Sequence, residues 1–360
     1  MPLAPEIAEF LSMLRDLPAE LRESDAMPIE QGRELHDASV DFLTPVEQRG
    51  TVASVQDASV SGPGGPVGIR IYRPVQAEPG PVPTLMWMHG GSWSSGSLKT
   101  ADVESRALCE GAGVVVVSVD YRLAPEHLFP AGLDDCGAVL RWIPANIGLL
   151  GGDAARIAVG GESAGATFAA VLGQNTTGHD VPLAAQMLVC PATDLSAATD
   201  DFPSRRAYER GYLFETADIE TAARRYLAPG TDRTDPRISP LHGKDLAAVP
   251  PMLLVTVEFD PLHDEAVAYG RKVADSGVRV VHRDIEGLVH GSLGMIGVSP
   301  TARAGLATAA AALAELLGVH GTIPPAATQG GAFLAHSERP GPAAAIAQLL
   351  REAGRPAIEP

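Results

Sequence analysis

The chain of 360 residues has few cysteines and few basic residues. Its three cysteines, Cys109, Cys136 and Cys190, are far apart and odd in number, and no Cys-x-x-Cys pair occurs. This argues against a disulfide framework and a structural zinc site, and predicts small buried thiols in a reducing compartment. Lys and Arg number 27 against 44 Asp and Glu, and the net charge of −17 argues against nucleic acid or an anionic membrane as partner.

Long hydrophobic runs are absent as well. No run reaches the roughly 18 apolar residues of a membrane span, and the N-terminus lacks the basic and apolar regions of a secretion signal. We therefore expect a cytoplasmic protein that does not bind membranes. Its hydrophobic residues, 45% of the chain, are enough to form a substantial core.

Strand-like and helix-like segments alternate through the middle of the chain. The pattern predicts strands at 51–55, 67–73, 84–88, 114–119, 156–160, 184–190, 252–258 and 278–285. It predicts helices at 133–142, 163–172, 264–276 and 301–317. Strands punctuated by helices indicate an α/β fold with a mostly parallel central sheet and helices on both faces.

Two segments interrupt this alternation. We expect 1–46, with an amphipathic helix at 5–17, to form an N-terminal cap segment, and about 196–240 to form a cap insertion in a catalytic domain at 47–318. Both would lie over the carboxyl edge of the sheet, where ligands bind in such folds. Residues 319–360 are predicted to form a C-terminal extension, a linker followed by a short helix.

The sequence Gly-Glu-Ser-Ala-Gly at 161–165 lies between a predicted strand and a predicted helix. A serine nucleophile needs a positioned base, and a sharp turn here would present Ser163 Oγ above the sheet edge. Gly161 and Gly165 permit this turn because side chains there would collide with the neighbouring strand and helix. The amide of Ala164 can donate to a developing oxyanion. A chance match in a chain with 38 glycines is the alternative, which the strand–turn–helix context disfavours.

His89-Gly90-Gly91 follows another predicted strand. Glycines let backbone amides converge on one oxygen, so Gly90 and Gly91 are predicted to complete the oxyanion hole. Without Ser163, a glycine-rich surface turn would be the simpler interpretation. We expect His89 to brace this loop rather than to transfer protons.

The base should be a histidine downstream of the nucleophile. His290 follows the last predicted strand, in a glycine-flanked loop from which an imidazole can reach back over the sheet. The other candidates are more often surface or capping residues, or lie within a strand or the C-terminal tail: His179, His242, His263, His282, His320 and His336.

The acid that orients the imidazole should follow the preceding strand. Asp260 lies in the loop after the strand at 252–258 and is our first choice, ahead of Glu258 and then Asp264. Asp264 and Glu265 are typical of the first turn of the next helix. A carboxylate at Asp260 would orient the Nδ1–H of His290 and stabilise the imidazolium.

Several motifs together resemble the hormone-sensitive-lipase-like esterases, also called bacterial family IV. They are the motifs at 89–91, 161–165, 260–262 and 290–291, and Asp-Tyr-Arg-Leu-Ala-Pro-Glu-His at 120–127 followed by Phe-Pro-Ala at 129–131. The resemblance covers about residues 52–317. It implies an α/β-hydrolase core with a helical cap, acting on carboxylic esters of short to medium acyl chains. It assigns the triad to Ser163, Asp260 and His290, and the oxyanion donors to Gly90, Gly91 and Ala164.

The resemblance also implies a structural role for Glu162 and for the segment 121–126. This segment would hold the turn at 161–165 and the loop at 89–91 in place. Two positions depart from the family pattern. Ser92 stands where a third glycine is usual, and could narrow the loop's conformations or touch the substrate. Ser292 stands where a phenylalanine is usual, and we expect looser packing around His290.

The sequence therefore predicts a serine carboxylesterase that needs neither metal nor cofactor and whose partner is a small-molecule ester. An amidase or lactonase using the same triad is the closest alternative. A non-catalytic ligand-binding relative is disfavoured, because Ser163, Asp260 and His290 are all retained. Whether the protein is a monomer or a homodimer stays open.

Overall fold

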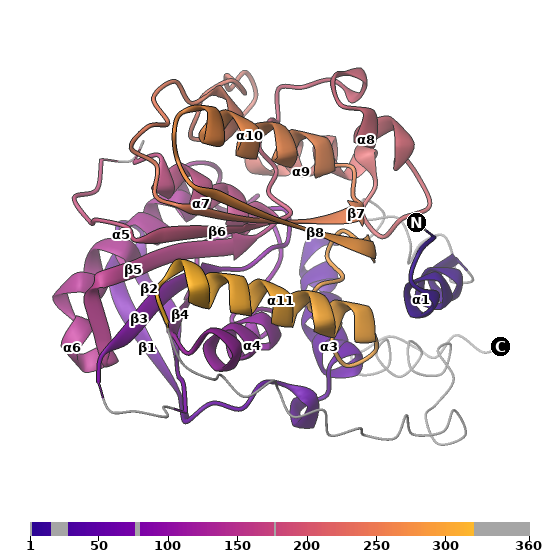
Figure 1. Cartoon of the computed structure of the whole chain (residues 1–360). Coiled ribbons are helices and arrows are strands. Elements are labelled where there is room, and N and C mark those ends of the chain that lie inside the picture. Colours follow the sequence, from indigo (N-terminus) through magenta and orange to yellow (C-terminus); the bar gives the residue numbers. More distant parts are fainter. Residues whose placement is uncertain (1, 16–27, 76–79, 176–177, 320–360) are drawn as a thin grey trace.

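The computed structural model describes residues 2–15, 28–75, 80–175 and 178–319, and an eight-stranded sheet forms its centre (Figure 1). The strands lie in the order β1-β2-β4-β3-β5-β6-β7-β8. β2 is antiparallel to β1 and β4, and the other neighbours are parallel, so the predicted mostly parallel sheet is confirmed. The strands are β1 Ser54–Gly62, β2 Gly65–Arg73, β3 Val82–Met88, β4 Val115–Asp120, β5 Gly152–Glu162, β6 Ala185–Val189, β7 Met252–Phe259 and β8 Val280–Val289.

Most strands differ from their predicted bounds, and the largest differences are in β1, β5 and β8. β5 begins at Gly152, four residues before its predicted start. β1 begins at Ser54 and continues to Gly62, which pairs with Gly65 across a two-residue turn, so most of this strand was missed. Residues 286–289, predicted as loop, belong to β8. A register shift lets Val289 pair with Phe259, and this places His290 directly at the strand end.

Helices cover both faces of the sheet, as predicted (Figure 1). α4 (Asp102–Ala112) and α11 (Pro300–Leu316) pack on one face, with Leu85 and Trp87 of β3 in the same core cluster. The other face contacts α5 (Ala131–Ala145), α7 (Ala164–Gly173) and α10 (His263–Asp275), and receives Met86 and Met88 of β3. The alternation of side chains along a strand divides these residues between the two cores. The short α6 (Ile147–Leu150) precedes β5.

The remaining helices come from the two segments that interrupt the alternation. The first supplies α1 (Pro5–Arg15) and α3 (Ile29–Leu43), followed by the turn η1 (Val46–Gln48). The second supplies η2 (Thr199–Asp201), α8 (Pro203–Ala207), α9 (Thr216–Tyr226) and η3 (Pro240–His242).

Parts of two predicted elements lie outside the described residues: the end of the helix at 5–17, and the C-terminal extension from residue 320 onward. None of the described helices is long and apolar enough to cross a membrane. All three cysteines are buried with free thiols.

Candidate active site

Ser163, Asp260 and His290 meet at the carboxyl ends of β5, β7 and β8. His290 Nδ1 lies 2.8 Å from Asp260 Oδ2, and His290 Nε2 lies 2.9 Å from Ser163 Oγ. The three side chains are buried, with 6%, 1% and 5% of the surface of Ser163, Asp260 and His290 exposed. The structure thus brings together the three residues that the sequence singled out, although they come from distant parts of the chain.

Ser163 occupies a strained turn between β5 and α7. Its φ of 52° and ψ of −117° are rarely adopted by a residue with a side chain. Its N–H donates to the Val189 carbonyl at 2.8 Å, which ties the turn to β6. A Cβ added at Gly165 would lie 2.0 Å from Met88 O, and one at Gly161 would lie 2.4 Å from the Gly165 carbonyl carbon. Only glycine fits at either position, for the steric reason predicted.

Hydrogen bonds fix the protonation pattern of the site. Asp260 Oδ1 accepts the Leu262 N–H at 2.8 Å, which leaves Oδ2 to accept from His290 Nδ1. Nε2 of the neutral ring then presents its lone pair to the Ser163 hydroxyl. Burial lowers the pKa of His290, but the Asp260 carboxylate and its hydrogen bond raise it, with a contribution from Glu162, and the net shift is upward.

The Cys190 thiol lies beside Asp260 and His290, a proximity that the sequence did not indicate. Its sulfur lies within 4.8 Å of the side-chain ligand atoms of Asp260 and His290. Burial raises the pKa of this thiol well above its usual range, and the Asp260 charge adds to the effect. Cys190 therefore stays protonated beside the carboxylate.

The loop after β3 runs beside the nucleophile turn. Met88 pairs with Gly161 in the parallel register of β3 and β5, so residues 89–91 leave the sheet at the level of Ser163. Gly91 has a φ of 116°, and its carbonyl accepts the N–H groups of the residues at 94 and 95. Ser92 also has a positive φ, 55°, despite its side chain. The loop is thus a strained, tightly wound turn of fixed shape.

His89 packs against Tyr121 and bonds to the backbone of this loop, in agreement with the supporting role that we expected for it. Its ring stacks on Tyr121 with the ring centroids 4.2 Å apart, and its Nδ1 donates to Gly90 O at 2.7 Å. The Tyr121 hydroxyl donates to His89 O at 2.7 Å. Burial lowers the pKa of His89 to about 4, so its ring is neutral. The Glu162 carboxylate packs against Gly90, where an added Cβ would lie 1.7 Å from Oε2.

α3 holds the far side of the same loop through Arg33. Its guanidinium donates to Ser94 O at 2.8 Å and to Ala124 O at 2.9 Å, and it forms a bidentate ion pair with Glu126. His36, one turn further along, lies 2.9 Å from Ser95 Oγ. Sequence reasoning missed these residues, because nothing in the local pattern links α3 to a loop about 60 residues away.

A small, mainly apolar pocket lies beside Ser163. Trp93 and Phe214 line it, whereas Tyr208 and Tyr212 pack against Phe259. The lining residues come from the loop after β3, the turn between β5 and α7, the loop after β6, the second interrupting segment and the loop after β7: Ser92, Trp93, Ser163, Ala164, Ala192, Leu195, Phe214, Ile219, Ala222 and Leu262. Ser92 therefore lines the pocket, where a side chain can contact the substrate, as its sequence position suggested.

An aromatic ring packs on His290, but it comes from another part of the chain than position 292. Ser292 is fully buried and its Oγ donates to Val289 O at 2.7 Å, which closes the turn after β8. The Phe214 ring packs on His290 with centroids 4.5 Å apart. The looser packing expected from Ser292 is therefore compensated by an aromatic ring from the segment 196–240.

Comparison with known proteins identifies the family. The model of the α/β-hydrolase fold matches residues 85–294. An ethyl acetate hydrolase of Pseudomonas putida is 34% identical over 328 residues, which cover 88% of this chain and 100% of that protein. The chain belongs to the hormone-sensitive-lipase-like esterases of the α/β-hydrolase superfamily. The predicted fold class and family are confirmed.

Two further relatives of this esterase agree with the assignment. A carboxylesterase of Mycobacterium tuberculosis is 38% identical over 260 residues, 70% of this chain and 79% of that protein. The solved structure of a hyperthermophilic esterase from Pyrobaculum calidifontis is 34% identical, with a TM-score of 0.80 over 88% of this chain and 99% of that chain. The similarity extends beyond the core to most of the described chain.

Proposed function

We propose that this protein is a serine carboxylesterase that hydrolyses esters of short to medium acyl chains through an acyl-enzyme on Ser163. The observation that carries the proposal is the continuous hydrogen-bonded chain from Asp260 through His290 to Ser163, with contacts of 2.8 and 2.9 Å. Relatives named ethyl acetate hydrolase and carboxylesterase support the same reaction.

The reaction follows from the roles of these groups. Ser163 Oγ attacks the ester carbonyl while His290 Nε2 takes its proton, and Asp260 stabilises the imidazolium. The amides of Gly90, Gly91 and Ala164 would hold the oxyanion. His290 then protonates the leaving alkoxide and the C–O bond breaks. Water, deprotonated by the same imidazole, releases the acid and regenerates Ser163.

The pocket supports small acyl groups and a cap role for the two interrupting segments. It is small and its lining is mainly apolar, which suits a short acyl chain better than a long one. We propose that 1–46 and 196–240 form the cap on the catalytic domain at 47–318. Phe214, Ile219 and Ala222 line the pocket from the second segment, and Arg33 holds the oxyanion loop from the first.

Hydrolysis of p-nitrophenyl esters from acetyl to dodecanoyl tests the proposal. We expect kcat/KM to peak at short acyl chains and turnover to disappear in Ser163→Ala. A folded wild-type protein that cleaves no ester of the series would contradict the proposal. Parallel assays with matching anilides and lactones would then test the amidase and lactonase alternatives.

Gly91→Ala is expected to lower kcat about 10²–10³-fold, the usual cost of losing one oxyanion donor. The new Cβ would lie 2.3 Å from Ser95 O, and alanine rarely adopts the φ of 116° found here. The loop must therefore shift and carry its amides away from the oxyanion. Gly148→Ala, where nothing lies within 4 Å of the new Cβ, is the matched control. Equal kcat for Gly91→Ala and wild type would contradict the expected displacement of the loop amides.

A further inference from the structure

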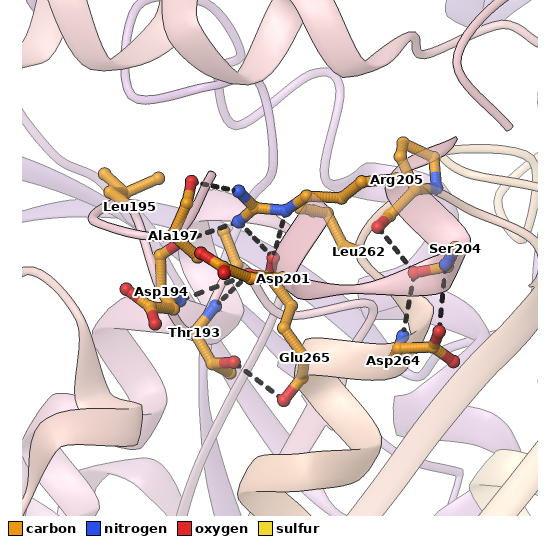
Figure 2. Close-up of polar contacts among 12 residues, drawn as sticks. Thr193, Asp194, Leu195, Ala197, Asp201, Ser204, Arg205, Leu262, Asp264 and Glu265 are labelled. Atoms are coloured by element: carbon orange, nitrogen blue, oxygen red, sulfur yellow. Dashed lines mark hydrogen bonds and ion pairs between the residues drawn. The ribbon is translucent and has the colours of Figure 1, made fainter. Parts of the chain in front are cut away.

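Arg205 and Glu265, which are not members of the predicted triad, form a buried ion pair (Figure 2). Arg205 belongs to α8 and Glu265 to the first turn of α10, and their side chains are 3% and 0% exposed. Glu265 Oε2 accepts from both Nε and Nη2 of Arg205. The prediction that Glu265 is a first-turn acid is correct in position, but its carboxylate points into the core rather than to solvent.

The pair also binds the loop that follows β6. Glu265 Oε1 accepts the N–H of Thr193 at 2.7 Å and that of Asp194 at 3.1 Å. Arg205 donates to the carbonyls of Asp194, at 2.7 Å, and Ala197, at 2.6 Å. Figure 2 shows the guanidinium fork lying between this loop and the carboxylate. Each buried charge is thus satisfied by the backbone of a third segment as well as by its partner.

Ser204, the neighbour of Arg205, makes a second set of contacts to the loop after β7. Its N–H donates to Asp264 Oδ2 at 2.9 Å, its hydroxyl donates to Pro261 O at 2.9 Å, and its Oγ accepts the Asp264 N–H at 3.2 Å. This loop starts at Asp260. Ser204 and Arg205 therefore connect α8 to both loops that flank the pocket.

These loops supply pocket walls next to the nucleophile. Ala192 and Leu195 line the pocket from the loop after β6, and Leu262 lines it from the loop after β7. Phe214, in the chain that leaves α8, lines it as well and packs on His290. The ion pair itself does not line the pocket, so it can act on the substrate only through the walls that it holds.

We propose that Arg205 and Glu265 are positioning residues that fix the width of the pocket and so limit the length of acyl chain that the esterase accepts. This inference rests on the proposed function. The pair is suited to the role because a planar guanidinium fork bound to a carboxylate and two carbonyls allows one geometry, which a flexible or apolar contact would not enforce. Stability alone does not explain it, because well-packed apolar residues stabilise a core equally well.

The test uses Arg205→Lys and the double variant Arg205→Met with Glu265→Gln. Lysine retains the charge but cannot bind the carboxylate and both carbonyls as a fork does. The double variant leaves no unpaired buried charge, which keeps it folded where a single neutral substitution would not. Arg206→Met is the matched control, because Arg206 lies next in α8, is 70% exposed and pairs with Asp200 at the surface.

We expect the ratio of kcat/KM for p-nitrophenyl octanoate to that for acetate to rise at least tenfold in both variants, with kcat for acetate nearly unchanged. Arg206→Met should keep the wild-type ratio. A purely structural role would lower the melting temperature and leave the ratio unchanged. Folded variants with the wild-type ratio would therefore overturn the inference.

Calorimetric binding of carboxylic acids from acetate to dodecanoate, measured on Ser163→Ala, separates this inference from the proposed function. Adding Arg205→Lys to this variant should strengthen the binding of the longer acids relative to acetate, because the pocket becomes wider. A wild-type protein that cleaves no ester would contradict the proposed function, while this binding series would still decide the role of the ion pair. An unchanged preference among the acids, or no binding of any acid, would overturn the inference.

Discussion

Replacing Ser163 by alanine is expected to lower kcat for ester hydrolysis about 10⁶-fold and to leave the fold intact. The hydroxyl is the atom that His290 faces at 2.9 Å, so its removal leaves the base without a nucleophile to activate. Alanine is smaller than serine, and the backbone N–H at position 163 can still donate to Val189 O. Steady-state kinetics with p-nitrophenyl acetate and circular dichroism of both proteins measure the two parts of this expectation.

Covalent labelling gives an independent measurement of the same serine. A fluorophosphonate should modify wild type once, at Ser163, and should leave Ser163→Ala unlabelled. Ser54→Ala, which changes an exposed serine at the start of β1, is the control and should behave as wild type. Labelling of Ser163→Ala at another residue, together with retained turnover, would show that the nucleophile has been assigned wrongly.

Asp260→Asn is expected to lower kcat about 10⁴-fold, as loss of the orienting acid does in other triads. Asp260 Oδ2 lies 2.8 Å from His290 Nδ1 and Oδ1 accepts the Leu262 N–H. An asparagine whose oxygen keeps the Leu262 bond turns its NH₂ toward His290, which stabilises the tautomer with its proton on Nε2. That tautomer cannot accept the Ser163 proton. A kcat within tenfold of wild type would assign the acid to another residue, with Glu258 the next candidate.

The pH dependence of this variant tests the electrostatic part of the same argument. Neutral His290 is the active form, so kcat/KM falls as the pH drops through its pKa. In the wild type Asp260 raises this pKa against the lowering effect of burial. With the charge removed, burial remains, so the pKa falls and the acid limb of the profile moves to lower pH. A limb that stays in place would mean that Asp260 does not set the pKa of the base.

Local motifs were enough to predict the site because each proposed catalytic group is attached to a strand end. The turn at 161–165, the loop at 89–91 and His290 can each be read from a few adjacent residues. Their meeting follows from the parallel sheet, in which the carboxyl ends of neighbouring strands share one edge. Strand bounds were predicted less well. β1 continued to Gly62 because pairing with β2, rather than local propensity, sets its length.

Contacts between distant segments could not be predicted in this way. Arg205 and Glu265 look like ordinary surface charges in sequence, and only the packing of α8 on α10 turns them into a buried pair. Phe214 is one of several aromatic residues in its segment, and nothing local indicates that it packs on His290. Arg33 is likewise an ordinary helical arginine in sequence, and only the fold brings it to the loop after β3, where it donates to Ser94 O.

The sequence by itself determined the class of fold, the family and the three residues expected to carry the reaction, because chemistry and sharp turns impose residue types at fixed local spacing. The tertiary structure alone decided the pocket, its walls and the ion pair that holds them. These depend on side chains that approach one another across the fold, and their energies come from burial and geometry that no local pattern contains.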